Sequence, residues 1–267
     1  MTRWVRFEDE GAEKFGTLAD DGSTIAVHSG NMFAGAAPTG TTIALDQVRL
    51  LAPVRPGKFL GLWNNFKELA TKNGHVFPTS PLYFIKAPTA LNDPEGVIRQ
   101  PSSELTRIFY EGELGIVIGK TCRNVDEAGA EAAIFGYTCV NDVTAAEAFG
   151  DDPNFSQWAR AKSCDTFGPI GPAIATGFDW AAARVKTVIN GRERQSYALG
   201  DMIIPPARIV SLISREMTLE AGDLIACGTS LGVLPMRPGT VVEVVIDGIG
   251  TLRNRYEGLN SEQKASA

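Results

Sequence analysis

The amino-acid sequence predicts an α+β fold that is mainly β, and three observations support this prediction. Short stretches in which hydrophobic and polar residues alternate outnumber the stretches with helical spacing. The helical stretches are few and scattered, so a regular βαβ alternation around a parallel sheet fits poorly. With 267 residues and 44% hydrophobic content, the chain is long enough for one main domain and a small one.

The first part of the chain predicts a small β-rich unit. Its alternating stretches, separated by Gly and Asp, cover residues 4–7, 24–28 and 48–51. The segment Pro-Val-Arg-Pro-Gly at 53–57 has the composition of a linker. We therefore divide the chain into a small β-rich N-terminal unit over residues 1–56, a main domain over 57–258 and a polar, flexible tail over 259–267.

The main domain combines predicted strands with isolated helices. The predicted strands cover residues 59–62, 82–86, 110–119, 137–142, 224–227 and 240–246, with another around residue 252. The predicted helices cover residues 65–72, 125–135 and 205–215. We expect Gly74 to end the first helix, and two prolines begin the third. For the second helix we expect Asn124 as N-cap, Glu127 as its capping-box partner and Gly136 as the stop.

Composition points to small molecules as partners. The net charge is -6 and no block of Lys and Arg residues occurs, which argues against nucleic acid or an anionic membrane. No apolar run approaches the ~18 residues needed to span a bilayer, and the first residues have no signal-peptide core, so we expect a cytoplasmic protein. The four cysteines are widely spaced and form no C-x-x-C pair, so we expect reduced thiols.

The sequence context argues against three familiar kinds of site. Residues 228–232 match G-x-S-x-G, the nucleophile elbow of serine hydrolases, but a Pro-containing segment follows instead of a helix and no histidine lies beyond His75. Residues 119–121 resemble the end of a phosphate-binding loop, yet Leu114 stands where that motif needs Gly. With two histidines in the whole chain, a His-based zinc site fits poorly as well.

Two glutamates in the predicted strand 110–119 are the strongest candidates for a functional site. The period of two in a strand places Glu111 and Glu113 on one face, roughly 6 to 7 Å apart, with Leu114 and Ile116 on the other. Two poorly solvated carboxylates raise each other's pKa or recruit a cation, and hard oxygen ligands favour Mg²⁺, Mn²⁺ or Ca²⁺. The alternative is an exposed edge strand with two solvated glutamates.

Two further residues extend this pair. Asp142 ends the predicted strand 137–142, and a helix between the two strands would let it reach the glutamates. Lys162 lies in residues 157–172, whose Gly and Pro content predicts a fixed irregular loop that can place a cation against carboxylates. Three carboxylates, one divalent cation and one lysine would make a site without net charge.

Five motifs follow one another along the chain. They are, in chain order, Tyr110-Glu111-x-Glu113-Leu114, Asn141-Asp142, Lys162-x-x-Asp165-x-Phe167-x-Pro169-x-Gly171-Pro172, Gly222-Asp223-x-Ile225 and Gly228-Thr229-x-x-Gly232. In series, these motifs resemble the fumarylacetoacetate hydrolase family. Their order and spacing match over residues 59–254, roughly three quarters of the chain. The resemblance implies a mixed β-roll, or sandwich-like, catalytic domain that is usually a homodimer.

The resemblance also implies roles for individual residues. The implied ligands of one Mg²⁺ or Mn²⁺ ion, with Ca²⁺ as a further option, are Glu111, Glu113 and Asp142. The implied substrate-binding residues are Gly228, Thr229, Gly232 and Lys162. Lys162 matches the family's active-site lysine, and Thr229 lies in the loop that faces the substrate; both are candidate catalytic residues. The family's substrates are 2-oxo acids and their enols, which bind the metal through the carboxylate and the oxo oxygen.

One departure concerns the segment that would cover the site. Many family members have a His followed three residues later by a Glu, a pair that activates the hydrolytic water. The corresponding residues here are Lys67 and Ala70, so Lys67 becomes the candidate base or proton donor. A lysine acts as a base near neutrality only where its pKa is lowered by about 3 units. His75 with Glu68 is the alternative replacement.

The sequence therefore predicts a metal-dependent enzyme that acts on a 2-oxo or 2,4-dioxo carboxylic acid. Hydrolysis of a carbon-carbon bond through a metal-stabilised enolate is the first hypothesis. Decarboxylation, hydration or enol-keto isomerisation of the same substrate class is the alternative, because decarboxylation and isomerisation need little beyond a proton donor. A third hypothesis is a protein that binds oxo acids without turnover.

Overall fold

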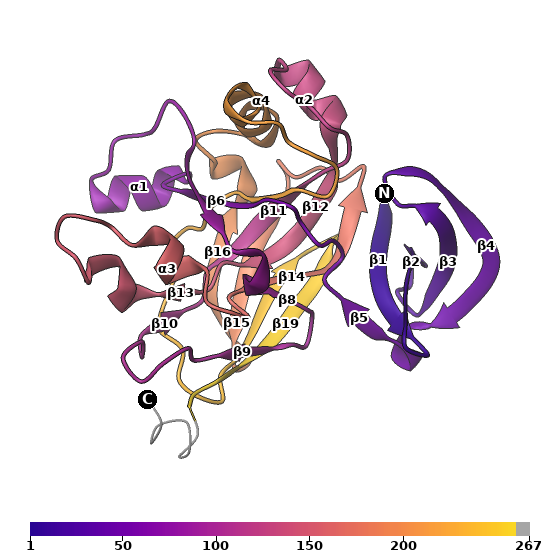
Figure 1. The fold of residues 1–267 in the computed structure, drawn as a ribbon, viewed down its shortest axis with the longest axis horizontal. Coiled ribbons are helices and arrows are strands. Elements are labelled where there is room, and N and C mark those ends of the chain that lie inside the picture. The colour runs from indigo at the N-terminus through magenta and orange to yellow at the C-terminus, as the bar shows by residue number, and fades with distance from the viewer. Residues whose placement is uncertain (260–267) are drawn as a thin grey trace.

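The computed structural model describes residues 1–259 and shows an α+β protein dominated by β-sheet (Figure 1). This confirms the predicted fold class. The helices are α1 (Lys67–Asn73), α2 (Glu127–Ala133), α3 (Trp158–Lys162) and α4 (Pro206–Glu216). In residues 1–259 no helix has the length and apolar character needed to span a bilayer. The predicted tail, apart from Leu259, falls outside the described residues.

The N-terminal strands lie to one side of the molecule, coloured indigo in Figure 1. They are β1 (Thr2–Asp9), β2 (Ala12–Leu18), β3 (Thr24–Asn31), β4 (Ala34–Ala44) and β5 (Arg49–Leu51). The sequence pattern indicated β1, β3 and β5 but missed β2 and β4. The sequence of β4 is rich in Ala and Gly and contains Pro38, all poor strand formers, so its pairing with β3 must outweigh its weak intrinsic preference. The division at residue 56 stays a prediction.

The large sheet joins these strands to the main domain. Its further strands are β6 (Phe59–Trp63), β7 (Leu82–Lys86), β8 (Leu91–Asn92), β11 (Gly112–Ile118), β12 (Ile134–Asn141), β14 (Gly168–Thr176) and β17 (Leu224–Ala226). Within residues 1–259 the order is β4-β3-β2-β1-β14-β12-β11-β17-β6-β7, with β5 beside β1 and β8 beside β14. The strand that carries the predicted glutamates, β11, therefore lies inside the sheet, between β12 and β17.

A second sheet packs against the large one. Its strands are β9 (Val97–Arg99), β15 (Arg184–Ile189), β16 (Arg192–Ala198), β18 (Val241–Ile246) and β19 (Gly250–Glu257). A short antiparallel pair, β10 (Ile108–Phe109) and β13 (Thr144–Ala145), forms a separate two-stranded sheet. Contacts of β14 with β19 and of β12 with β18 bring the two sheets together. The result is the sandwich-like arrangement that the sequence predicted.

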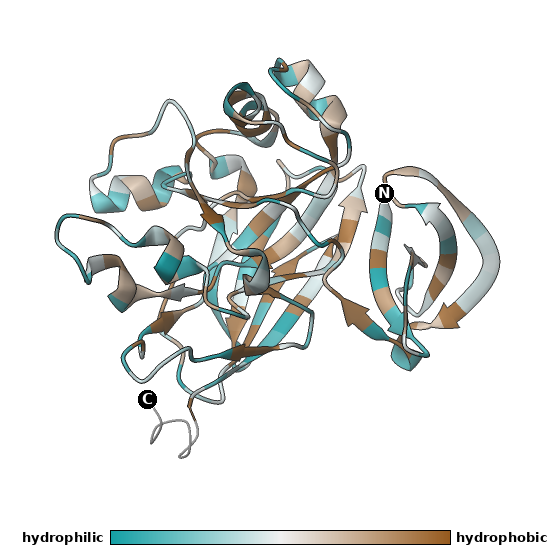
Figure 2. Cartoon of the chain, viewed as in Figure 1, coloured by the Kyte–Doolittle hydropathy of each residue, from teal (hydrophilic) through white to brown (hydrophobic). Residues whose placement is uncertain are grey.

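Both faces of β11 are buried. Leu114 and Ile116 join the main hydrophobic cluster together with Val244 of β18, whereas Val117 joins a different cluster with Val140. Full burial of such side chains stabilises the fold by roughly 1.5 to 3 kcal/mol each. Figure 2 shows hydrophobic and hydrophilic residues alternating along half-buried strands such as β1. In β11 every residue is buried, so any charged group on it must find its partners inside the protein.

Two local predictions are corrected by the structure. The N-cap of α2 is Asp126, whose carboxylate accepts a 2.8 Å hydrogen bond from the Gly129 amide. Asn124 has φ +53°, a left-handed conformation that an N-cap residue does not adopt, so it cannot serve as the predicted cap. Residues 157–172 are also more regular than predicted, because α3 and the start of β14 leave a short irregular connection between them. The predicted helix at 205–215 is confirmed as α4.

Candidate metal centre

The register of β11 and β12 brings the three predicted carboxylates together. Glu111 immediately precedes β11, Glu113 lies within it, and Asp142 immediately follows β12. The strands are antiparallel, and the Asp142 amide donates a 2.9 Å hydrogen bond to the Glu111 carbonyl. One carboxylate oxygen from each residue lies within 4.8 Å of the other two. The alternative of a solvated edge strand is therefore excluded, since Glu113 and Asp142 are each 1% exposed.

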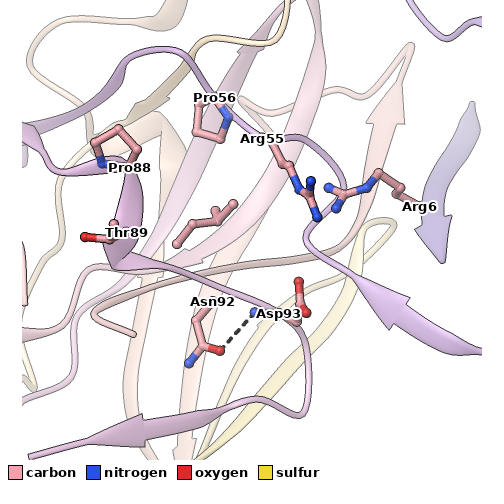
Figure 3. Close-up of a pocket in the computed structure, with 8 residues that line it drawn as sticks. Arg6, Arg55, Pro56, Pro88, Thr89, Asn92 and Asp93 are labelled. Carbon is pink, nitrogen blue, oxygen red and sulfur yellow. Dashed lines mark hydrogen bonds between the residues drawn. The ribbon is translucent and has the colours of Figure 1, made fainter. Parts of the chain in front are cut away.

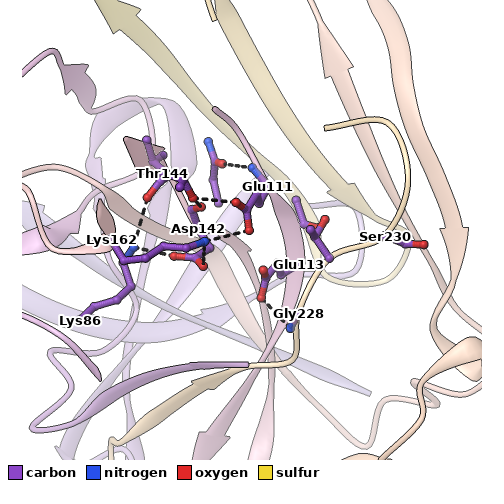
Figure 4. Close-up of polar contacts among 12 residues, drawn as sticks. Lys86, Glu111, Glu113, Asp142, Thr144, Lys162, Gly228 and Ser230 are labelled. Carbon is purple, nitrogen blue, oxygen red and sulfur yellow. Dashed lines mark hydrogen bonds and ion pairs between the residues drawn. The ribbon is translucent and has the colours of Figure 1, made fainter. Parts of the chain in front are cut away.

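Two buried lysines neutralise much of this negative charge (Figure 4). Lys162, at the end of α3, places Nζ 2.6 Å from Asp142 Oδ2 and 2.9 Å from Glu111 Oε2. Lys86, the last residue of β7, places Nζ 2.5 Å from Asp142 Oδ1. The sequence analysis treated Lys86 only as the end of a strand. A lysine closing an otherwise apolar strand is the one signal that could have identified it, because lysine is rarely buried without a charged partner.

We call Glu111, Glu113, Asp142, Lys86 and Lys162 the carboxylate cluster. With all three carboxylates ionised, as they would be when they bind a cation, its three negative and two positive groups carry one net negative charge, where the sequence analysis had counted a single lysine. A divalent cation would therefore leave one net positive charge instead of none. This excess of positive charge would favour the binding of an anionic substrate.

Burial and the ion pairs together set the protonation of the carboxylate cluster. Burial alone would raise the pKa of Asp142, but Lys162 and Lys86 outweigh it and lower that pKa below its usual value. The pKa of Glu113 is raised well above its usual value, first by burial and then by the charges of Asp142 and Glu111. Burial lowers the pKa of Lys86, whereas at Lys162 the charges of Asp142 and Glu111 outweigh burial and raise the pKa.

The donor set fits a hard divalent cation. Glu113 Oε2 accepts a 2.7 Å hydrogen bond from the Gly228 amide, but Glu113 Oε1 is buried and has no hydrogen-bond partner among residues 1–259. A buried carboxylate oxygen without a partner is costly unless a cation or a proton satisfies it. All three candidate ligands offer oxygen atoms, which Mg²⁺ and Mn²⁺ prefer over the softer ligands that zinc takes.

The loop 228–232 lies directly against the carboxylate cluster. Gly228 has φ +91°, a conformation that L side chains rarely adopt, and this turn aims its amide at Glu113. The Thr229 hydroxyl donates a 2.9 Å hydrogen bond to the carbonyl of Gly112, between the two glutamates. The structure thus brings Gly228 and Thr229 to the site. It also buries Ser230.

Gln195 of β16 ties this loop to β11, and the sequence analysis missed it. Its side chain is buried, and Oε1 accepts hydrogen bonds from the Gly112 amide at 3.1 Å and the Thr187 hydroxyl at 2.8 Å. Its Nε2 donates to Thr229 Oγ1 at 2.9 Å and to the Ser230 carbonyl at 3.1 Å. No sequence pattern indicates this role, because a Gln in an alternating strand reads as an ordinary polar residue.

A cavity of about 320 Å³ opens from the carboxylate cluster between α1 and the loop. Glu111, Thr229 and Gly232 line it on one side, and Leu69 and Lys72 of α1 on the other. Lys67, the candidate base, is exposed at the first position of α1 and does not line this cavity. The other candidate pair is also separate from it, since the His75 ring packs 5.0 Å from the Trp63 ring and neither His75 nor Glu68 lines the cavity.

A different cavity, of about 400 Å³, lies where the N-terminal strands meet the main domain (Figure 3). Arg6 and Arg55 line it from one side, and Thr89 and Asn92 from the other. Arg6 and Arg55 both pair with Glu13, so the two guanidinium groups share one carboxylate. This cavity contains none of the predicted site residues.

Comparison with known proteins agrees with this geometry. A family model described as fumarylacetoacetate (FAA) hydrolase C-terminal matches residues 58–257, and one described as Rv2993c-like, N-terminal matches residues 2–53. The oxaloacetate tautomerase YisK of Bacillus subtilis is 34% identical, over 79% of this chain and 74% of that protein. The 2,4-didehydro-3-deoxy-L-rhamnonate hydrolase of a Sphingomonas strain is 32% identical over 95% of each chain. The crystal structure of 2-hydroxyhepta-2,4-diene-1,7-dioate isomerase from Mycobacterium marinum gives a TM-score of 0.88 at 35% identity, covering 98% of this chain and 100% of that one.

Proposed function

This chain belongs to the fumarylacetoacetate hydrolase family, and from that premise we propose that it is a metal-dependent enzyme that interconverts the enol and keto forms of a 2-oxo acid. The observation that carries the proposal is the convergence of three carboxylates beside Lys162, with one buried oxygen of Glu113 left without a partner in residues 1–259. The three relatives reported above are named for oxo acids or their enols, and two of these three are a tautomerase and an isomerase.

The proposed cofactor is Mg²⁺ or Mn²⁺, with Ca²⁺ as a further option, held by Glu111, Glu113 and Asp142. When bound, the ion supplies a Lewis acid for the negative charge that develops on the 2-oxo oxygen. Without the ion, Asp142 and Glu111 outweigh burial and raise the pKa of Lys162, so Lys162 holds its proton and offers positive charge and a hydrogen-bond donor. Lys86 holds the other oxygen of Asp142 and fixes the direction of that carboxylate.

The residues on the side of α1 that faces the cavity favour isomerisation over hydrolysis. Hydrolysis requires a group that activates a water molecule above the substrate. The residues of α1 that line the cavity are Leu69, Lys72 and Asn73, which include neither a carboxylate nor an imidazole. Enol-keto interconversion requires a group that carries a proton to or from C3, but it does not require a residue of α1 that activates water. Hydrolysis of a carbon-carbon bond remains the second candidate, because the Sphingomonas relative that matches 95% of this chain is named as a hydrolase.

A substrate panel tests the proposal. Purified protein with Mg²⁺ or Mn²⁺ is mixed with oxaloacetate, acylpyruvates and 2-hydroxydienoates in deuterated water, and NMR with mass spectrometry identifies the products. We expect metal-dependent deuterium incorporation at C3 or interconversion of enol and keto forms. Cleaved products would select the hydrolase, whereas binding of the acids without any change would select the silent binding protein.

We further propose that the protein is a homodimer. The terminal strand of the large sheet, β7, exposes Leu82 at 43% and Ile85 at 50%, and Phe155 of a neighbouring loop is 67% exposed. An edge strand with exposed apolar side chains is a surface that soluble proteins normally cover. Light scattering coupled to size-exclusion chromatography should give twice the mass of one chain; a monomer at micromolar concentration would contradict this.

A further inference from the structure

One side of α1 faces the cavity, and helical spacing shows which residues lie on that side. Leu69, Lys72 and Asn73 stand at positions i, i+3 and i+4, which share one face of a helix, and all three line the cavity. At about 100° per residue, Lys67 lies about 160° around the helix from Leu69. The lysine that α1 presents to the cavity is therefore Lys72.

The start of α1 is fixed by side-chain bonds to the backbone of other segments. Asn65 accepts a 2.9 Å hydrogen bond from the Ile204 amide and donates one, also 2.9 Å, to the Cys227 carbonyl. The Glu68 amide donates a 3.0 Å hydrogen bond to Asp201. These bonds set the rotation of the helix about its axis, so the presentation of Lys72 is a property of the fold.

Around Lys72 the wall of the cavity is largely apolar, with Trp63, Leu69, Leu231 and Val233 among the lining residues. Lys72 is the one cation among the described residues that line it, and it forms no ion pair within residues 1–259. Glu111, the acidic residue at the other end, is already bonded to Lys162 and to the Thr144 hydroxyl. Lys72 is therefore free to bind an anionic group of a ligand.

Building on the proposed function, we propose that Lys72 binds a second carboxylate at the far end of the substrate, so that the enzyme selects 2-oxo dicarboxylates. A substrate whose oxo-acid end lies at Glu111 would extend along the apolar wall toward Lys72. Charge supports the same assignment. The carboxylate cluster with a divalent cation carries one net positive charge and Lys72 adds another, which together balance a dianion. A cavity of about 320 Å³ is at the small end of the ~300 to 1,000 Å³ usual for ligand sites, which favours a short diacid.

The test compares a short 2-oxo diacid with its distal monomethyl ester, which keeps the chain length and removes the distal charge. Wild type should prefer the diacid. Lys72→Met should lower kcat/KM for the diacid at least tenfold, mainly through KM, and change the value for the ester less than twofold, because the distal contact is made equally in the ground state and the transition state. Lys72→Arg should retain most of the preference. Lys120→Met, which removes an exposed lysine away from the cavity, is the matched control for net charge.

Calorimetric binding of the same two ligands to the Mg²⁺-loaded variants separates this inference from the proposed function. If no oxo acid is turned over, the proposed function fails, yet weaker binding of the diacid alone by Lys72→Met would still support the role of Lys72. Equal losses for diacid and ester in Lys72→Met, or an equal loss in Lys120→Met, would overturn it. So would a wild-type protein that treats the diacid and the ester alike.

Discussion

The two sides of the cavity hold their charged groups in different ways. In the carboxylate cluster, Asp142 is buried and bonded to two lysines, and its position follows from the pairing of β11 with β12. On the α1 side, Lys72 is exposed and forms no ion pair within residues 1–259. A charged group of the carboxylate cluster therefore contributes to the folded core as well as to the site. A charge on α1 can change with little effect on folding, which makes α1 the side where specificity can vary.

The largest effect should come from Asp142→Asn. This change leaves Lys86 and Lys162 buried with less negative charge around them, and breaking a buried ion pair in this way typically costs about 3 to 5 kcal/mol. Urea denaturation of the metal-free protein measures the loss. Asp247→Asn is the control, since Asp247 is exposed and pairs with Lys186 at the surface, where such a pair contributes about 0 to 1 kcal/mol. Equal losses in both variants would remove the distinction between the two sides.

Glu113→Gln should separate metal binding from folding. The neutral amide is a weaker ligand for Mg²⁺, so we expect the affinity measured by calorimetry to fall by at least ~100-fold and metal-dependent turnover to disappear. The stability of the metal-free protein should change by less than about 1 kcal/mol, because burial already disfavours the charged form of Glu113. Glu131→Gln on α2 is the exposed control. Unchanged Mg²⁺ affinity in Glu113→Gln would refute the ligand assignment.

Gln195→Met should have a smaller effect, confined to the loop. It removes the bonds that hold Thr229 and Ser230 and leaves the Gly112 amide without its partner, at a cost of about 1 to 3 kcal/mol. We expect about a tenfold rise in KM, with Mg²⁺ affinity changed less than threefold. Gln47→Met, at an exposed position, should change neither quantity. A loss of Mg²⁺ affinity equal to that of Glu113→Gln would show that Gln195 supports the ligands themselves.

The smallest effect should come from Lys67→Met. Because Lys67 is turned away from the cavity, we expect less than a twofold change in kcat and in the equilibrium constant of unfolding. Steady-state kinetics with the best substrate of the panel measures it. A tenfold loss of kcat would mean that α1 rotates during turnover and that Lys67 is the proton donor that the family resemblance suggested.

The parts of the site that the sequence could predict are those fixed by strand geometry. The period of two placed Glu111 and Glu113 on one face, and the helix between β11 and β12 allowed Asp142 to return beside them. The roles of Lys86 and Gln195 could not be predicted, because each depends on partners far away in the chain: Asp142 lies 56 positions from Lys86, and Gly112 lies 83 positions from Gln195. The orientation of α1 could not be predicted either, because it depends on hydrogen bonds to residues 201–204 and 227.

The fold shows the same division. Several strands with alternating hydrophobic residues were found from the pattern, although β15, which also alternates, was missed. By contrast, β4, with its Ala, Gly and Pro, forms because β3 offers it an edge to pair with. At α2, Asp126 and not Asn124 caps the helix, a choice decided by the left-handed backbone of Asn124 that the residue types alone do not reveal.

The central claim is that Glu111, Glu113 and Asp142 hold one divalent cation against which a 2-oxo acid binds. An anomalous difference map from crystals grown with Mn²⁺ and a slowly reacting oxo acid tests it most directly. We predict one Mn²⁺ peak within about 2.0 to 2.3 Å of an oxygen from each of the three carboxylates, with the acid in contact with it. An ion bound elsewhere, or an acid bound away from these residues, would contradict the account.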